Sequence, residues 1–174
     1  MKKFFALLLC FSFSSLSLGQ KRGSVQTSSA GRLSYDVSAS AGTYASGNYN
    51  EINLGLNWDF SESMTWRNSL FSRFGNGVES TNGLDSSLRF KFGSSSQDGT
   101  FGVDAFFGPG VRIGSAKSNA AFGEAGVKFT LGGLRLGVGY KGLYYLEVRK
   151  DSAGNELPRN DGQFFLTLAG GGVL

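Results

Sequence analysis

The stretch YNEINLGLNWDF, residues 49 to 60, alternates between apolar and polar side chains at nearly every position. Its even-numbered residues from position 52 onward are apolar: Ile52, Leu54, Leu56, Trp58 and Phe60. Its odd-numbered residues from position 51 onward are polar or glycine: Glu51, Asn53, Gly55, Asn57 and Asp59. A period of two is that of a β-strand whose two faces meet different environments. The stretch therefore predicts one long strand with an apolar face and a charged face.

The same period recurs along most of the chain. It predicts strands at 32–44, 49–60, 64–75, 84–92, 100–114, 121–131, 134–149 and 163–174. Short connections alternate with mostly longer ones, and Asn-Gly or Asp-Gly dipeptides mark several of them. The longest connection, 150–162, is expected to carry Asp161 as a surface residue. An even number of such strands, with short turns at one end and longer loops at the other, predicts an all-β, eight-stranded, antiparallel up-and-down barrel.

The charges lie on one face of these strands. Every charged residue within the eight predicted segments has the parity opposite to the apolar set. A soluble barrel would hide the apolar face and a membrane barrel would expose it, so this pattern alone fits both. Strand lengths near those that cross a bilayer, and glycines on the charged face, favour the membrane barrel. So do aromatic residues of the apolar face near a short turn, which we expect at the lipid interface: Trp58, Phe60 and Trp66.

The charged face carries both signs in near balance. Because a buried ion needs a partner, we expect these side chains to pair and to close the interior, whereas a single sign would indicate an ion-selective pore. The expected ion-pair network consists of Arg32, Asp36, Asp59, Arg67, Arg89, Lys91, Asp104, Glu124, Lys128, Arg135 and Lys141. The other charged residues with inward parity are Glu51, Arg73, Asp85, Arg112, Glu147 and Arg149.

The first nineteen residues have the layout of a bacterial secretory signal peptide. Lys2 and Lys3 precede an apolar run to about Phe13, and a stretch of small residues ends near Gly19. A membrane-spanning helix is the weaker interpretation, because the run is too short. We expect a leader at 1–19, a short polar arm at 20–30 and a barrel at 31–174, exported to the bacterial outer membrane.

Several kinds of chemistry are disfavoured by composition. The chain has no histidine, and its single cysteine, Cys10, lies in the expected leader. The commonest general base, the commonest transition-metal ligand, thiolate chemistry and disulfides are therefore missing from the mature chain. We expect no catalytic residue, no cofactor and no metal. Nucleic acid is not an expected partner, because no long basic cluster is present.

The segment LGVGYKG, residues 136 to 142, matches the G-x-G-x-x-G spacing of dinucleotide-binding loops. A functional match needs a strand before it and a helix after it. Here the segment lies inside a predicted strand. Its glycines are better explained by crowding in a narrow barrel than by a bound phosphate.

Together these features resemble the small outer-membrane barrels of the OmpA/OmpX type. The resemblance covers the whole chain after the leader and is one of architecture, without a motif that names a subfamily. It implies termini in the periplasm, long loops outside the cell, and the lipid bilayer and the outer-membrane assembly machinery as partners. Such barrels usually end in an aromatic residue, whereas this chain ends in Leu174, which is in phase with the apolar face.

The leading functional hypothesis is a non-enzymatic, monomeric envelope component, or a protein that meets an unknown partner through its surface loops. Outer-membrane lipases, proteases and lipid A-modifying barrels generally use a histidine, so an enzyme here would depend on carboxylates such as Asp85 with Glu147. A second hypothesis is a barrel that holds a small apolar molecule among inward aromatics: Phe71, Phe106, Phe122, Tyr145 and Phe165. A third is association within the membrane through outward residues: Asn68, or the small residues Ala121, Gly123, Ala125 and Gly142.

Overall fold

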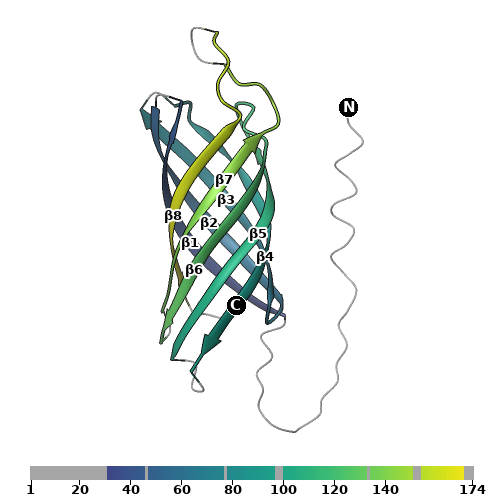
Figure 1. The fold of residues 1–174 in the computed structure, drawn as a ribbon, viewed down its shortest axis with the longest axis vertical. Helices are drawn as coiled ribbons and strands as arrows, with labels where there is room; N and C mark the ends of the chain where they lie inside the picture. Colours follow the sequence, from purple (N-terminus) through teal and green to yellow (C-terminus); the bar gives the residue numbers. More distant parts are fainter. Residues whose placement is uncertain are drawn as a thin grey trace.

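The computed structural model describes residues 31–45, 47–76, 78–96, 100–132, 134–150 and 154–170. Eight strands in this part of the chain form one closed barrel, which confirms the predicted all-β, up-and-down architecture (Figure 1). The strands are β1 (Arg32–Tyr44), β2 (Gly47–Ser61), β3 (Met64–Asn76), β4 (Thr81–Ser95), β5 (Phe101–Gly114), β6 (Ala120–Leu131), β7 (Leu134–Tyr145) and β8 (Asn160–Gly170). The predicted leader at 1–19, the arm at 20–30 and Leu174 lie outside the described residues.

Hydrogen bonding between strands closes the sheet on itself. Each strand pairs antiparallel with its neighbours in sequence, and β8 pairs with β1, so that Val37 lies opposite Leu168. A closed sheet has no edge strand and pairs its backbone polar groups internally, as a structure surrounded by hydrocarbon must. None of the described residues belongs to a helix that is long and apolar enough to cross a membrane.

The two ends of the barrel differ. At the turn end, the β2–β3 connection is Glu62 and Ser63, and the β6–β7 connection is Gly132 and Gly133. At the opposite end, which we call the loop end, residues 146–159 connect β7 to β8, and the described parts of this connection, 146–150 and 154–159, rise above the strands in Figure 1. The two-residue β1–β2 connection, 45–46, is also at the loop end, so not every connection there is long.

The predicted bounds of the last two strands were wrong. β7 ends at Tyr145 rather than at 149, because Ala120 of β6 lies opposite Tyr145 and the ladder ends there. β8 begins at Asn160 rather than at 163, so the Asp161-Gly162 dipeptide lies in a strand and not in a turn. The absence of a side chain at Gly162 leaves room for the ring of Tyr140, which a Cβ there would meet.

Burial is reversed relative to a soluble protein. Leu54 is 57% exposed and Phe164 is 73% exposed, whereas Glu51 is fully buried. The outer wall is thus a broad apolar belt, and the charged face of each strand forms the interior. An exposed apolar surface of this extent marks a contact with lipid or another apolar partner.

Glycines on the inner face make the narrow barrel possible. A Cβ at Gly108 would meet the backbone of Leu88, and a Cβ at Gly139 would meet the ring of Phe165. Gly139 belongs to the stretch that matched the dinucleotide spacing. Packing inside the barrel therefore accounts for this glycine without a bound phosphate.

Candidate functional site

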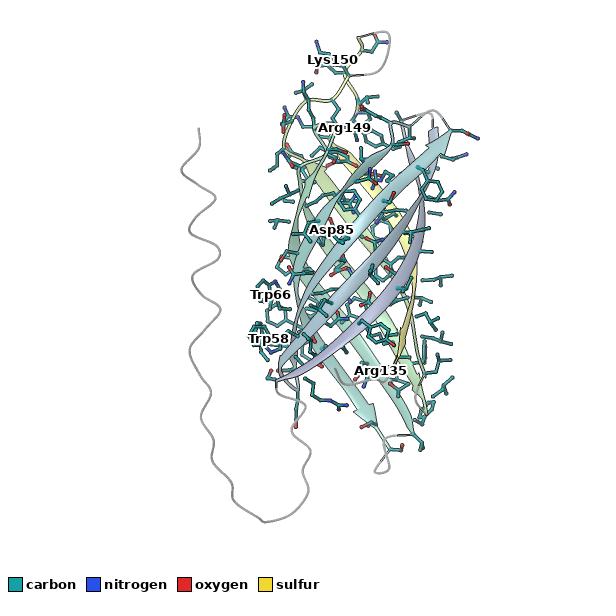
Figure 2. The ribbon with its side chains drawn as sticks, turned by 180° about the vertical axis from the view of Figure 1, so that it is seen from behind. Trp58, Trp66, Asp85, Arg135, Arg149 and Lys150 are labelled. Atoms are coloured by element: carbon teal, nitrogen blue, oxygen red, sulfur yellow. The ribbon has the colours of Figure 1, made fainter. Side chains whose placement is uncertain are left out.

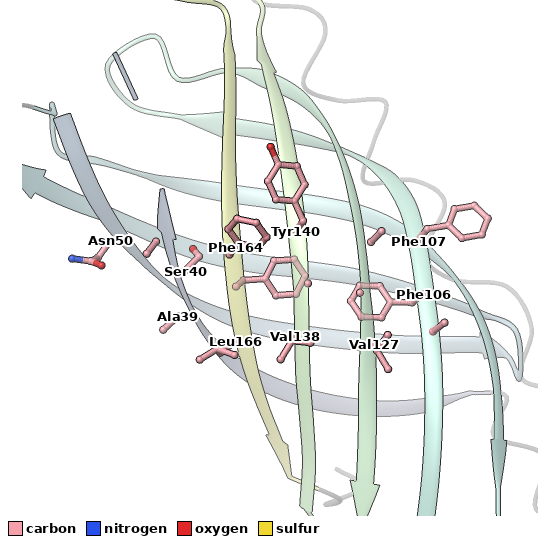
Figure 3. Close-up of a pocket in the computed structure, with 16 residues that line it drawn as sticks. Ala39, Ser40, Asn50, Phe106, Phe107, Val127, Val138, Tyr140, Phe164 and Leu166 are labelled. Atoms are coloured by element: carbon pink, nitrogen blue, oxygen red, sulfur yellow. The ribbon is translucent and has the colours of Figure 1, made fainter. Parts of the chain in front are cut away.

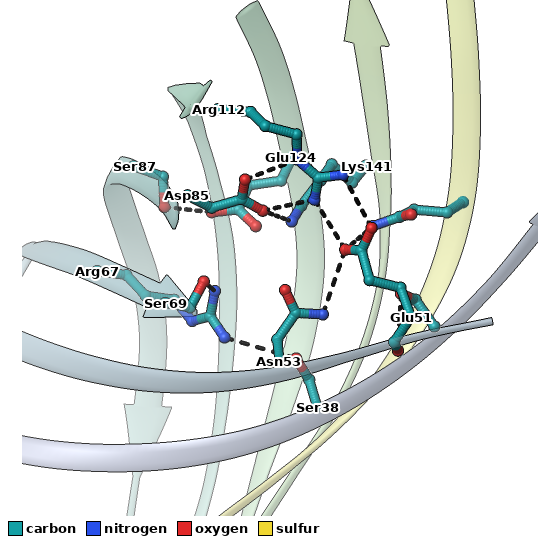
Figure 4. Close-up of polar contacts among 12 residues, drawn as sticks. Ser38, Glu51, Asn53, Arg67, Ser69, Asp85, Ser87, Arg112, Glu124 and Lys141 are labelled. Carbon is teal, nitrogen blue, oxygen red and sulfur yellow. Dashed lines mark hydrogen bonds and ion pairs between the residues drawn. The ribbon is translucent and has the colours of Figure 1, made fainter. Parts of the chain in front are cut away.

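The interior ion network is the most elaborate polar structure in the described part of the chain, and Glu51 of β2 lies near its centre. Both carboxylate oxygens of Glu51 accept hydrogen bonds from Arg112 of β5, at 2.8 Å each. Arg73 of β3 donates from Nε to Glu51 Oε2 at 3.0 Å, and Gln163 of β8 donates to Glu51 Oε1 at 3.0 Å. One carboxylate of β2 thus connects three other strands, β3, β5 and β8, and Figure 4 shows its contact with Arg112.

Arg112 extends the network to a second carboxylate. Its Nε and Nη2 donate to the two oxygens of Asp85, at 2.7 Å each, and Lys141 donates to Asp85 Oδ2 at 2.8 Å. The ring of Phe71 lies 3.8 Å from the Arg112 guanidinium carbon, so the cation also contacts an aromatic face. Paired, bidentate geometry of this kind offsets part of the cost of burying charge.

A third carboxylate, Asp161, completes the network toward the loop end. Arg73 Nη1 donates to Asp161 Oδ2 at 2.7 Å. The hydroxyl groups of Tyr49 and Tyr145 donate to Asp161 at 2.8 and 3.0 Å. The prediction that Asp161 is a surface-loop residue was therefore wrong, because its side chain is enclosed and balances the charge of Arg73.

Toward the turn end, separate ion pairs continue the same arrangement. Arg89 makes two hydrogen bonds to Glu124, at 2.8 Å each, and Ser87 donates to the same carboxylate at 2.6 Å. Arg67 pairs with Asp36 at 2.6 Å. Two further contacts lie nearest this end: Lys91 to Asp59 at 2.7 Å, and Thr65 to Asp59 at 2.5 Å.

The charges in these contacts balance. Among the described residues, the ion pairs inside the barrel join six cations to six carboxylates. Four residues of the expected network have no ion-pair contact with a described residue: Arg32, Asp104, Lys128 and Arg135. Lys128 lies beside Asp104 in the β5–β6 register, and its Nζ is 5.3 Å from the centre of the Phe106 ring. The observed network thus differs from the expected one, because its centre is formed by Glu51, Arg73 and Arg112, which were not among the expected members.

The aromatic residues with inward parity are all buried, but they do not form one cluster around a pocket. Phe71 stacks on Arg112, and Phe122 lies 4.8 Å from Lys141 Nζ. Phe106 and Phe165 are partners, with ring centres 6.3 Å apart. Phe122 and Tyr145 both belong to an apolar group toward the loop end, together with Tyr44, Tyr49 and Leu143. No described cavity is lined by all five rings: Phe106 and Phe165 border a groove of the outer wall, and Phe122 borders a shallower hollow next to it.

One small cavity lies in the middle of the barrel. Its volume is about 10 Å³, and its lining includes Asn53, Arg89, Glu124 and Phe165. That volume has room for about one water molecule. At this level the interior is therefore closed to solutes.

The loop end is covered from above. Arg149 is buried, although it lies beyond β7, and its guanidinium carbon is 5.0 Å from the Tyr44 ring centre and 4.8 Å from that of Tyr145. The Tyr44 hydroxyl donates to the backbone oxygen of Pro158 at 2.5 Å. The base of the β7–β8 connection is thus folded over the barrel mouth (Figure 2).

The proposed carboxylate pair of an enzyme is not assembled. Asp85 is enclosed with Arg112 and Lys141, whereas Glu147 is exposed in the β7–β8 connection and accepts a hydrogen bond from Asn119. The prediction that Glu147 points inward was wrong, because β7 has already ended. Among the described residues, no group of three or more acidic residues is arranged to hold a metal ion.

The aromatic residues expected at the lipid interface are grouped on the outer wall. The ring centres of Trp58 and Phe60 are 4.9 Å apart, and each lies 6.2 Å from that of Trp66. Figure 2 shows Trp58 and Trp66 close to the turn end, opposite the end that carries Arg149. This is where an interfacial aromatic girdle belongs.

The outer wall of β5 to β8 and β1 also carries a mostly apolar groove of about 950 Å³ (Figure 3). Ala39, Val127 and Val138 line it, and Phe107, Tyr140 and Phe164 project from its sides. The small residues that the sequence singled out adjoin it: Ala125 lines the groove, and Ala121, Gly123 and Gly142 line a shallower hollow next to it. Its apolar lining suits hydrocarbon chains.

Comparisons with known proteins agree with this architecture. No family model and no curated protein matches the sequence. Among solved structures, the chain is similar to one from the de novo design of transmembrane β-barrels, with a TM-score of 0.53 and 13% identity over 81% of this chain and 95% of that one. It is also similar to the outer-membrane enzyme PagL, with a TM-score of 0.53 and 17% identity over 77% of this chain and 97% of that one. The fold is thus that of transmembrane β-barrels.

Proposed function

We propose that this chain is an integral barrel of a bacterial outer membrane that acts through its outer wall and loops, without conducting solutes and without catalysis. The observation that carries the proposal is the interior: balanced ion pairs cross the barrel and leave a central cavity of only about 10 Å³. A pore needs a continuous water path, and a ligand-holding barrel needs a larger cavity.

The outer membrane is the location that the wall and the ends of the molecule support. An apolar belt with grouped aromatics near the turn end suits a bilayer. The predicted leader would export the chain, and assembly in the outer membrane would require that membrane's assembly machinery. The β7–β8 connection would then face outward, where it is available to a partner.

Two measurements test the location and the closed interior. The protein should fractionate with outer membranes, and its gel mobility should differ between boiled and unboiled samples. In planar bilayers the purified protein should give no stepwise conductance above that of protein-free bilayers. Recovery in the soluble periplasm without a mobility shift would overturn the location, and stable unitary conductance would overturn the closed interior.

The absence of catalysis needs its own test, because PagL shows that this fold can carry an enzyme. Purified protein incubated with lipid A should release no fatty acid. Release that Asp85→Asn abolishes, while the mobility shift is retained, would contradict the proposal and restore a carboxylate-based mechanism.

A further inference from the structure

The outward face of the β3–β4 ladder differs from the rest of the belt. We call its six residues the β3–β4 seam: Asn68, Leu70, Ser72, Asn82, Leu84 and Ser86. In register, Asn68 lies opposite Ser86 and Ser72 opposite Asn82, with a pair of leucines between them. Two polar pairs therefore lie on a wall whose outward residues are mostly apolar.

The β7–β8 ladder provides the contrast. Its outward pairs are apolar or aromatic: Leu136 with Leu168, Val138 with Leu166, and Tyr140 with Phe164. Lipid chains cover such a face without leaving polar groups unsatisfied. The β3–β4 seam has groups that lipid chains cannot satisfy.

Asn68 is the seam residue whose side chain is least satisfied by contact with lipid. Ser86 accepts a hydrogen bond from Trp66 Nε1 at 2.9 Å, whereas the Asn68 amide has no hydrogen bond to any described residue. Asn68 lies two residues from Trp66 along β3 toward the loop end, which places it about 5 Å deeper than the interfacial ring in a tilted strand. An amide without partners in hydrocarbon costs several kcal/mol.

We propose that the chain forms a symmetric dimer through the β3–β4 seam, with Asn68 hydrogen-bonded to Asn68 of a second copy. This inference rests on the proposed membrane location, because both copies must then have the same orientation. A two-fold axis along the membrane normal places a residue opposite its own copy at the same depth. An amide both donates and accepts, so two copies of Asn68 satisfy each other, which two like charges would not do.

The surroundings of Asn68 supply the apolar part of the contact. Leu70, which is 62% exposed, lies between the polar pairs, and Leu54 of β2 and Val111 of β5, at 57% and 55% exposure, flank the seam on the neighbouring strands. Packed side chains around a central hydrogen bond are the usual composition of helix contacts within membranes, and the same physics applies to barrel walls. The sequence alone favours a monomer, since parity shows that Asn68 faces outward but not that it lacks a partner.

The test uses single cysteines, since no described residue is a cysteine. The test variant is Leu70→Cys. The control is Leu166→Cys, because Leu166 lies on the β7–β8 ladder and is 65% exposed. Each is combined with Cys10→Ser and oxidised with copper phenanthroline in native membranes. We expect a disulfide-linked dimer from Leu70→Cys and at least tenfold less from Leu166→Cys. Adding Asn68→Leu should reduce the Leu70→Cys dimer at least fivefold and preserve the boiling-dependent mobility shift.

The outcomes separate this inference from the proposed function. Absence of a dimer from Leu70→Cys in protein that fractionates with outer membranes and shifts on boiling overturns the dimer and leaves the membrane barrel intact. A linked product of another mass overturns it in favour of a different protein partner. Protein found in the soluble periplasm, without the mobility shift, overturns both.

Discussion

The substitution Glu51→Gln measures what the interior ion network contributes to stability. Glu51 accepts two hydrogen bonds from Arg112 at 2.8 Å and one from Arg73 at 3.0 Å. Removing one partner of a buried ion pair costs about 3–5 kcal/mol, because the remaining charge is left uncompensated. Glutamine keeps the size of the side chain and one acceptor oxygen, so we expect a loss near the middle of this range, about 4 kcal/mol of unfolding free energy.

The loss is measured by urea titration of protein folded in phospholipid vesicles, with the fluorescence of Trp58 and Trp66 as the signal. At a urea dependence of about 2 kcal/mol per molar, a loss of about 4 kcal/mol lowers the midpoint by about 2 M. Glu62→Gln is the matched control, since Glu62 is exposed in the β2–β3 turn. We expect that change to stay within about 0.5 kcal/mol.

A second substitution separates charge balance from packing. Arg112→Gln combined with Glu51→Gln removes one charge of each sign and leaves the Arg73–Asp161 and Lys141–Asp85 pairs in place. The double variant should therefore lose at least about 1 kcal/mol less than the sum of the single variants. The explanation fails if Glu51→Gln is as stable as the unmodified protein, or if the two losses simply add.

Three further outcomes follow from the same structure. Lys128→Met should change the urea midpoint by less than about 0.5 M, because Lys128 has no ion pair with a described residue, whereas Arg112→Met should lower it by about 2 M. Gly139→Val should abolish the mobility shift on boiling, because its side chain would meet Phe165, while Gly123→Val, facing open space, should preserve it. In the Trp58→Phe variant all tryptophan fluorescence comes from Trp66. In vesicles of brominated lipids, bromine atoms near the headgroup should quench this fluorescence more than bromine atoms at the chain ends.

The alternation of side chains was sufficient to predict the two faces of each strand, because in a strand the parity of a residue determines its face. Leu54 and Glu51 show this directly, since one is exposed on the outer wall and the other is enclosed. The number of strands, their lengths and the connection lengths were also needed to predict a membrane barrel. Parity does not determine which strands meet across the interior. The contacts of Arg89 with Glu124 and of Arg112 with Glu51 depend on strand stagger and side-chain length, which only the closed barrel establishes.

The errors at the loop end have a common cause. Alternation continues from Leu146 to Arg149, so the period alone predicts a longer β7, but a strand needs a paired neighbour and β6 begins at Ala120. The Asp-Gly signal at Asp161 is a local preference for a turn. It is overridden by contacts with Arg73, Tyr49 and Tyr145, which are distant in sequence. One feature of the sequence could have indicated the buried position of Asp161. Arg73 has inward parity near the loop end, and a buried cation there requires a nearby carboxylate.

Several ion pairs join strands that are not neighbours, and this explains how a barrel with so little apolar interior can close as a unit. Arg67 of β3 pairs with Asp36 of β1, Lys91 of β4 with Asp59 of β2, and Lys141 of β7 with Asp85 of β4. These strands are separated by one or two others. In a flat sheet they would lie about 10 to 15 Å apart, so the pairs form as the sheet curls and closes. A partly closed sheet would therefore hold unpaired ions that only water can solvate, so insertion into hydrocarbon becomes favourable when closure has already matched the charges.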